Sequence, residues 1–418
     1  MEQNSLENRM GEAPQGPGGL AGFLDYVRGF DAFSTKTVSS TYQVEGIEVP
    51  GFANEFWTSK QRAGHSIHEV SYRACYKPQL PRFFIDYLCP PNGSVYDPFM
   101  GRGTTLVEAQ MLGRQALGND INPLGRMLAE PRLNPPSFEE LVERVEGISL
   151  FGLAEPRSGL SIFFHPETLS EIEGWRGYFR ERLRVGVFDR VDDWLRMVVC
   201  NRLTGHSSGF FSVYTLPPNQ ATSMIAQEKI NVKRKQVPEY RDTKALVIKK
   251  SKQLLRDGLP EGYARGDAVF TTRSADDTPE LGDGTIDLVV TSPPFLDVVN
   301  YEQDNWMRNW FCEVPFETGK LWQLRSIDMW RDRMTDTLKE LKRVLKIGGV
   351  VAFEVGEVRN AKVLLEKEVI RAGMDAGLAA RAVVINVQEF TKTAQVWGVS
   401  NNAKGTNSNR IILLEKTG

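Results

Sequence analysis

The apolar positions predict strands and helices that alternate in two separated parts of the chain. Short apolar runs typical of buried strands occur at 94–96, 115–120, 286–290, 350–355, 382–387 and 410–415. Helix-forming residues and helical spacing predict helices over 78–88, 104–112 and 327–345. Strands that alternate with helices usually form a parallel sheet that is covered on both faces. The pattern therefore predicts a doubly wound α/β sheet.

The alternation stops between these two parts for more than a hundred residues. Apolar positions in 136–205 are spaced by three, as at Leu169, Ile172 and Trp175, and predict helices. An aromatic loop follows at 206–220, and a basic helical stretch comes after it. We therefore expect a mostly helical insertion at 136–260 within the α/β sheet.

The N-terminal region is expected to contain two different parts. Residues 1–22 are polar, with several glycines and prolines, and predict a disordered tail. Residues from 23 onward contain many aromatic side chains and predict an ordered layer that leads into the sheet.

The composition narrows the class of protein. The hydrophobic share of 41% and the charged share of 25% are ordinary for a globular chain, and no apolar run is long enough to span a membrane. The N-terminus lacks the pattern of a secretory signal, and the four cysteines show no CxxC spacing. These features predict a cytoplasmic protein without disulfides. The four histidines form no HxxxH pair, so no metal site is expected.

Charge is concentrated in one segment of the predicted insertion. Although the net charge is −2, residues 229–256 carry ten Lys and Arg side chains and two acids, a local excess of eight positive charges. This segment is either a solvated helix face or a nucleic-acid contact. The loop that begins at Asn201 is either packed around Phe210 or reads base edges. The candidate nucleic-acid-binding residues are Arg202, Lys233, Arg234 and Lys235.

The first motif with chemical meaning is the stretch from Asp97 to Thr104, DPFMGRGT. An acid ends a predicted strand, and two glycines lead into a helix. Glycines let backbone amides approach a ligand closely, and a helix N-terminus favours its negative end. The stretch has neither the Gly-Lys-Ser/Thr ending of a P-loop nor the third glycine of a dinucleotide fingerprint. Asp120, at the end of the next predicted strand, is either an acceptor for two ribose hydroxyls or a surface turn acid.

The second motif is Ser292-Pro293-Pro294-Phe295 at the end of an apolar strand. An exocyclic amino group of a base is a poor nucleophile because its lone pair is conjugated into the ring. Acceptance of its hydrogens by Ser292 and by the Pro293 carbonyl would free that lone pair. Phe295 would stack on the base, which must leave the duplex to be reached.

These two motifs resemble those of the DNA amino-methyltransferases, which methylate N4 of cytosine or N6 of adenine. The family motif DPFxGxGT is similar to Asp97–Thr104, and (Asn/Asp/Ser)-Pro-Pro-(Tyr/Phe) is similar to Ser292–Phe295. The resemblance implies a fold of the methyltransferase (Rossmann-like) type with S-adenosylmethionine as cofactor. It assigns catalysis to Ser292, Pro293, Pro294 and Phe295. It assigns cofactor binding to Lys77, Pro78, Asp97, Pro98, Phe99, Gly101, Gly103, Thr104, Asp120 and Asp267. Arg102 departs from the family, which usually has a small residue there.

The resemblance also implies a function and a division of labour. Thr-Ser-Pro-Pro-Phe is more similar to the N4-cytosine branch, so we expect methylation of N4 in a flipped cytosine of double-stranded DNA. The alternatives are N6-adenine methylation, an RNA base methyltransferase and a non-catalytic DNA-binding subunit. Residues 23–135 would hold the cofactor, 136–260 would recognise the target, and 261–418 would carry catalysis. Restriction–modification is the expected context, and it makes a cognate restriction endonuclease a candidate partner.

Overall fold

The structure, a computed structural model, describes most of the chain. The described residues are 19–33, 35–57, 64–73, 75–150, 159–216, 218, 220–260, 263, 268–294, 301–314, 322, 324, 326–356, 364–387 and 408–418. The tail was predicted over residues 1–22, of which residues 1–18 lie outside this range. Residues 19–22 differ from the expectation because they form the start of a helix.

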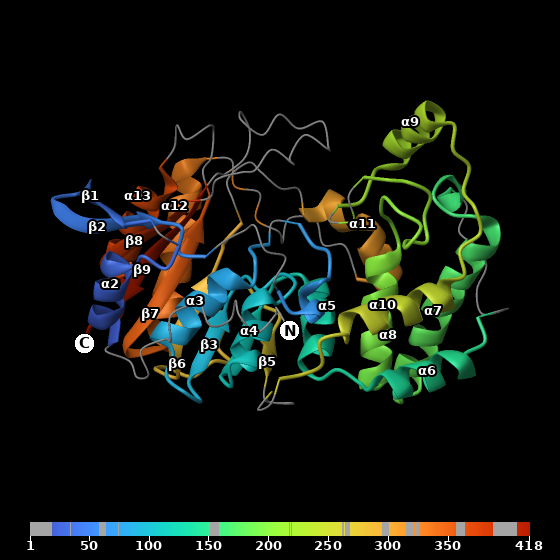
Figure 1. The fold of residues 1–418 in the computed structure, drawn as a ribbon, viewed down its shortest axis with the longest axis horizontal. Helices are drawn as coiled ribbons and strands as arrows, with labels where there is room; N and C mark the ends of the chain where they lie inside the picture. The colour runs from blue at the N-terminus through green and yellow to red at the C-terminus, as the bar shows by residue number, and fades with distance from the viewer. Residues whose placement is uncertain are drawn as a thin grey trace.

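One sheet contains all the named strands, in the order β1-β2-β8-β9-β7-β6-β3-β4-β5 (Figure 1). The bounds are β1 Val38–Val44, β2 Ile47–Asn54, β3 Ser94–Asp97, β4 Gln115–Asn119, β5 Val269–Thr271, β6 Ile286–Thr291, β7 Leu345–Val355, β8 Ala379–Val387 and β9 Ser408–Glu415. Strands β3 to β7 are mutually parallel, and β9 runs antiparallel to β7 and β8. The predicted doubly wound α/β sheet is confirmed.

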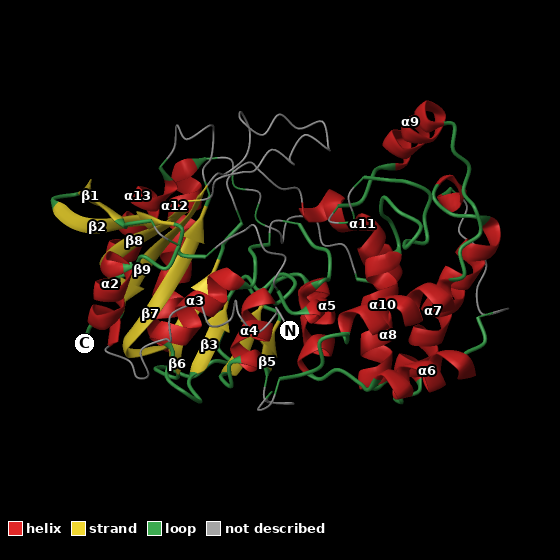
Figure 2. Cartoon of the chain, viewed as in Figure 1, coloured by secondary structure: helices red, strands yellow, loops and turns green. Residues whose placement is uncertain are grey.

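The helices of the described chain cover both faces of this sheet and also form a separate group (Figure 2). Their bounds are α2 Gly19–Gly29, α3 Gln79–Leu88, α4 Thr104–Met111, α5 Pro123–Leu133, α6 Phe138–Gly147, α7 Pro166–Arg184, α8 Arg190–Arg202, α9 Met224–Arg234, α10 Thr243–Leu254, α11 Tyr301–Cys312, α12 Ile327–Val344 and α13 Leu365–Asp375. None of these helices is long and apolar enough to cross a membrane.

The two faces of the sheet have separate cores because successive side chains of a strand point to opposite faces. Val95 of β3 packs in the cluster that includes Phe84 of α3, whereas Tyr96 packs with Leu338 of α12 and Val369 of α13. All four residues of β3 are buried, as expected for a central parallel strand covered on both sides.

The strand order reverses direction at β3. The chain passes from β3 to β4 and β5 on one side, and the later strands β6 and β7 lie on the other side. Ligands of open α/β sheets bind at such a switch point, outside the carboxyl ends of the strands. The β3–β6 pair therefore marks the expected place of the functional site.

Helix α2 and the β1–β2 hairpin lie at the other end of the sheet from β5. Strand β2 pairs with β8, and β1 forms the edge. The hydrophobic pattern did not predict β1 because five of its seven residues are exposed. An edge strand keeps little of the alternation that marks a half-buried strand.

Helices α6 to α10 lie between β4 and β5 in the sequence and gather beyond the β5 edge (Figure 1). Buried tryptophans join them: Trp175 of α7 donates to Thr243, and Trp194 of α8 donates to Ser251, both at 3.0 Å. Helices α6, α7, α8 and α10 share one apolar cluster with α3, α4 and one sheet face. The insertion is therefore packed onto the sheet through a continuous core.

Candidate functional site

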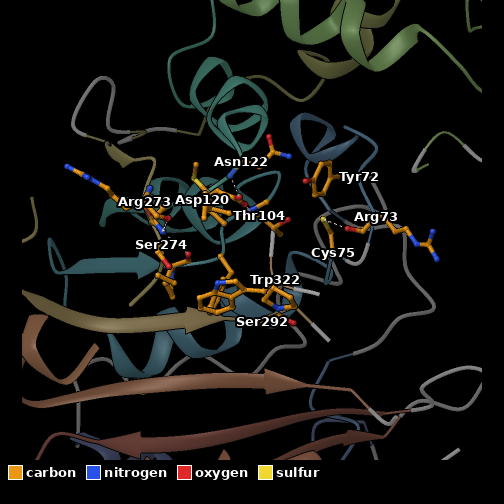
Figure 3. Close-up of a pocket in the computed structure, with 18 of the residues that line it drawn as sticks. Tyr72, Arg73, Cys75, Thr104, Asp120, Asn122, Arg273, Ser274, Ser292 and Trp322 are labelled. Atoms are coloured by element: carbon orange, nitrogen blue, oxygen red, sulfur yellow. Dashed lines mark hydrogen bonds between the residues drawn. The ribbon is translucent and has the colours of Figure 1, made fainter. Parts of the chain in front are cut away.

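A cavity opens at the carboxyl ends of β3, β4, β5 and β6, at the switch point of the sheet (Figure 3). Its walls come from the segment before α3, the glycine loop, and the segments that follow the strands. The lining residues are Tyr72, Arg73, Cys75, Tyr76, Pro98, Phe99, Met100, Gly101, Thr104, Asn119, Asp120, Ile121, Asn122, Arg273, Ser274, Ala275, Ser292, Pro294 and Trp322.

Asp120 is held by the glycine loop on one side and by the start of α5 on the other. Its Oδ2 accepts the Gly101 N–H at 2.9 Å, and its Oδ1 accepts the Asn122 N–H at 2.8 Å. Gly101 adopts a φ of 50°, which favours glycine. Burial raises the pKa of Asp120 to about 6. Each oxygen keeps a lone pair for a further donor, so Asp120 can accept hydroxyl groups of a ligand in the cavity.

Gly103 is needed for helix packing rather than for contact with the cavity. It has a φ of 75°, and a Cβ placed there would lie 2.5 Å from the Ala129 Cβ of α5. Only glycine lets the start of α4 approach α5 this closely. Gly103 is absent from the cavity wall, although the sequence predicted it to contact the cofactor.

Asp97, which was also predicted to contact the cofactor, is buried behind the cavity wall. Its carboxylate accepts hydrogen bonds from the Tyr76 hydroxyl at 2.9 Å, the Thr291 hydroxyl at 2.6 Å and the Phe99 N–H at 3.1 Å. Burial raises its pKa, and these donors oppose that rise. Asp97 therefore connects the ends of β3 and β6 and fixes the position of the strand that carries Ser292.

Ser292 lies at the end of β6 and lines the cavity. Its hydroxyl is hydrogen-bonded to Glu354 of β7, a fully buried carboxyl that also accepts Asn409 Nδ2 at 3.0 Å. Burial raises the pKa of Glu354, and the two hydrogen bonds oppose this rise. The following turn is fixed by the Trp330 indole, which donates to the Pro294 carbonyl at 3.0 Å. The structure thus places a buried carboxyl directly behind the serine.

The remaining predicted site residues have different positions. Pro98, Phe99 and Thr104 line the cavity, whereas Pro293 is buried beside it. Lys77 is exposed and Pro78 is the N-cap residue of α3, and neither is among the residues that line the cavity. Phe295 lies outside the described residues.

Asp267, which the sequence also predicted to bind the cofactor, lies outside the described residues. The segment that follows β5, Arg273–Ala275, lines the cavity.

Arg102, the departure from the family motif, is directed away from this cavity. Its Nη1 donates to the carbonyls of His68 at 3.1 Å and Val70 at 2.6 Å, and its Nε donates to the Thr104 hydroxyl at 3.2 Å. Arg102 thereby connects the glycine loop to the segment that carries Tyr72.

The candidate nucleic-acid-binding residues fall into two groups. Lys233, Arg234 and Lys235 are exposed at the end of α9, where the Arg234 guanidinium lies 3.8 Å from the Tyr214 ring centre. Figure 1 shows α9 projecting from the insertion, on the side toward which β7 points. Arg202 is only 8% exposed and stacks 4.0 Å from the Phe210 ring centre, so it does not lie on the open surface.

Sequence reasoning missed several residues of the site. Tyr72, Asn122, Arg273 and Trp322 line the cavity, and Glu354 supports Ser292. The only available signal was the position of Glu354, an acid inside the otherwise apolar run of β7. Among the described residues, no group of three or more His, Cys, Asp or Glu side chains is placed to hold a metal ion.

The cavity fits S-adenosylmethionine. The molecule has a ribose diol, a flat adenine ring and a methionine portion with a charged amino and carboxyl group. Asp120 offers acceptors for the diol, Ile121 and Ala275 offer apolar contact for a ring, and Gly101 lies where a backbone can approach closely. S-adenosylmethionine is the cofactor that these residues accommodate.

Comparisons with known proteins point the same way. Residues 41–125 match the family model described as DNA methylase, N6_N4_Mtase. The chain is 30% identical over 149 residues to the type II methyltransferase M.MvaI of Kocuria varians, which covers 35% of this chain and 28% of that protein. It is 32% identical over 90 residues to the type II methyltransferase M.MjaII of Methanocaldococcus jannaschii, which covers 21% of this chain and 17% of that protein.

The chain thus spans less than a third of the length of the curated relatives that it matches. A SAM-dependent methyltransferase structure from Methanosarcina mazei aligns with a TM-score of 0.33 and 11% identity, over 79% of this chain and 96% of that one. The fold assignment rests on the strand order described above. The matched residues 41–125 form the β1–β4 part of this sheet, so this part of the chain is similar to the DNA methylase family.

Proposed function

We propose that the protein transfers a methyl group from S-adenosylmethionine to N4 of a flipped cytosine in double-stranded DNA. The observation that carries this proposal is the hydroxyl of Ser292, which lines the cavity and is hydrogen-bonded to the buried Glu354. N6 of adenine is the second candidate target, because both amines present the same two hydrogens to an acceptor.

The chain's own residues would act on the target amine by hydrogen bonding and positioning. S-adenosylmethionine supplies an electrophilic methyl group when bound. The Ser292 hydroxyl can donate its hydrogen to Glu354 and keep its oxygen lone pairs available to accept an amine hydrogen. This acceptance frees the amine lone pair, and the fixed turn at Pro294 holds the geometry.

The amine gains a positive charge when its new bond forms, and it must then lose a proton. Ser292 can accept that proton while its own proton passes to Glu354. Burial favours the neutral form of Glu354, as its raised pKa indicates, so the carboxyl is suited to receive a proton. Overall, the methyl carbon would exchange its bond to the cofactor sulfur for a bond to the amine nitrogen, one N–H bond would be lost, and its proton would be carried by Glu354 until solvent removes it.

The insertion at 136–260 is the proposed target-recognition part. Helix α9 combines exposed cations with exposed apolar side chains, including Ile225 at 69% and Val232 at 80% exposure. Cations contact phosphates, and apolar side chains can wedge between bases. We assign α9 to DNA contact on these grounds.

The base assignment is tested by product analysis. The protein is incubated with tritiated S-adenosylmethionine and mixed-sequence duplex DNA, and the labelled nucleoside is identified by mass. Label on N4-methylcytosine is the expected result. Label on N6-methyladenine would keep the mechanism and change the base. Transfer to RNA alone, or no transfer, would overturn the proposed function.

Cofactor affinity is expected to depend on the ionisation of Asp120. Hydroxyl donors favour the carboxylate, and the pKa of Asp120 is about 6. Affinity for S-adenosylmethionine should therefore fall as the pH is lowered from 7 to 5, approaching tenfold per pH unit below 6. Calorimetric titration across this range measures the effect.

Asp120→Asn should remove this pH dependence and weaken binding about 10- to 100-fold, because an amide accepts fewer hydrogen bonds. Asp276→Asn is the matched control. Asp276 lies just beyond the cavity wall and pairs with Arg333 at 3.3 Å. Equal effects of the two substitutions would contradict the role of Asp120.

A further inference from the structure

A second pocket lies where the glycine loop meets the insertion, and it is lined mainly by charged and polar side chains. Arg102 comes from the glycine loop, Arg202 from the end of α8, and Lys250 from α10, with Glu69 and Gln253 beside them. Tyr72 lines both this pocket and the cofactor cavity. The pocket therefore adjoins the cofactor cavity. It is also open to solvent.

Two of its cations are almost completely buried. Arg202 is 8% exposed and Lys250 is 6% exposed. The Arg202 Nε donates to the carbonyl of Asn201 at 3.1 Å, and within the described part of the chain no carboxylate forms an ion pair with its guanidinium. Lys250 Nζ lies 3.1 Å from the Gln253 amide oxygen and 3.6 Å from the Glu69 carboxylate.

Glu69 offers only partial compensation. Its carboxylate is shared between Lys250 and Arg256, at 3.6 and 3.7 Å, and is itself 38% exposed. Burial, reinforced by the charge of Arg202, lowers the pKa of Lys250 to about 8. Burial and the nearby Arg308 lower the pKa of Arg202 to about 10. The pocket thus holds three cations, Arg102, Arg202 and Lys250, and one lining acid, Glu69, an arrangement that an anion would stabilise.

We propose that this pocket binds one phosphodiester group of the DNA strand that presents the target base. The inference rests on the proposed function and adds a specific contact to it. A phosphate offers several acceptor oxygens to guanidinium and ammonium donors on different sides, and charge-assisted bonds to phosphate are short and strong. The position beside the catalytic cavity favours a strand phosphate over a free anion.

This phosphate contact would couple the position of the bound DNA strand to the position of the cofactor. Arg102 reaches the pocket from the residue next to Gly101, whose N–H holds Asp120. Arg202 and Lys250 belong to the insertion. A phosphate held by Arg102 on one side and by Arg202 and Lys250 on the other would therefore align the insertion with the glycine loop. The glycine loop in turn holds Asp120, the acceptor for the ribose hydroxyls.

The test compares the salt dependence of DNA binding in the full-length wild type and in Lys250→Gln. Binding of a fluorescent duplex of about 30 base pairs is measured by anisotropy at several KCl concentrations. Loss of one phosphate contact should reduce the slope of log affinity against log salt by about 0.9. It should also weaken binding about tenfold at low salt. Thermal unfolding and affinity for S-adenosylmethionine show whether the variant remains folded.

Lys339→Gln is the matched control. Lys339 is 58% exposed on α12, on the opposite face of the sheet, and pairs with Asp336. The Lys339→Gln substitution should leave the slope of log affinity against log salt unchanged. Arg202→Gln provides a second variant and should lower the slope in the same way as Lys250→Gln.

Three outcomes would overturn the inference or its basis. If the slope of log affinity against log salt stays unchanged in both Lys250→Gln and Arg202→Gln, the phosphate contact is overturned and the proposed function is not affected. Stabilisation of the wild type by inorganic phosphate, lost in Lys250→Gln while the slope stays the same, would assign the pocket to a free anion instead of DNA. Failure of the wild type to bind DNA at all would overturn the proposed function itself.

Discussion

Ser292→Ala is expected to lower the rate constant for methyl transfer about 100- to 1000-fold, the range seen when one preorganised hydrogen-bonding group is removed. The substitution removes the oxygen that accepts the amine hydrogen and leaves Glu354 with one fewer hydrogen-bond donor. The affinity for DNA should stay within about twofold, because this contact strengthens as the transition state forms. Single-turnover methylation and anisotropy measure the two quantities separately.

Ser274→Ala is the control for this prediction. Ser274 also lines the cavity, but it follows β5 and lies outside the Ser292–Glu354 pair. Its loss should leave the rate constant for transfer nearly unchanged. Glu354→Gln should keep the fold and lower the rate constant for transfer, because an amide is a poor proton acceptor. The loss should be smaller than in Ser292→Ala, because the amide oxygen can still accept the hydrogen bond from Ser292. Equal losses of rate and of DNA affinity in Ser292→Ala would contradict a catalytic role.

Gly103→Ala is expected to destabilise the protein by about 2–6 kcal/mol. A left-handed backbone costs about 1–3 kcal/mol for a non-glycine residue, and overpacking costs a further 1–3 kcal/mol. The added Cβ would lie 2.5 Å from the Ala129 Cβ and 3.3 Å from its Cα. Backbone and Cβ atoms cannot rotate away as a long side chain could. Equilibrium unfolding in urea measures the loss.

Gly113→Ala isolates the backbone contribution. Gly113 follows the other end of the same helix with a φ of 69°, and no heavy atom lies within 4 Å of the added Cβ. It should cost only about 1 kcal/mol, the usual cost of alanine in place of a left-handed glycine. Equal losses in the two variants would show that the contact with Ala129 does not limit stability.

The continuous core has a consequence for engineering of the insertion. Trp175 and Trp194 are fully buried and belong to the cluster that also contains Leu106 of α4 and Val290 of β6. Exchange of the insertion for one from another chain would therefore expose apolar surface on the sheet side as well. The insertion and the sheet therefore form one folding unit in this protein.

The local sequence determined the central strands, the helices around them and the two motifs. Apolar runs set the positions of β3, β4, β6 and β7, because a central parallel strand is buried on both faces and admits few polar residues. The residue types of DPFMGRGT and TSPPF likewise indicated a cofactor loop and an amine-binding turn before any contact was known.

Only the tertiary structure decided which side chains meet. Asp97 joins β3 to β6 through Thr291, a residue 194 positions away, and Glu354 reaches Ser292 across neighbouring strands. Arg202 stacks on Phe210 and lines a pocket with Arg102, whereas the sequence left open whether this segment is packed around Phe210 or reads base edges. Such pairings depend on strand order and on how the insertion packs. These are properties of long-range burial, and local residue patterns do not encode them.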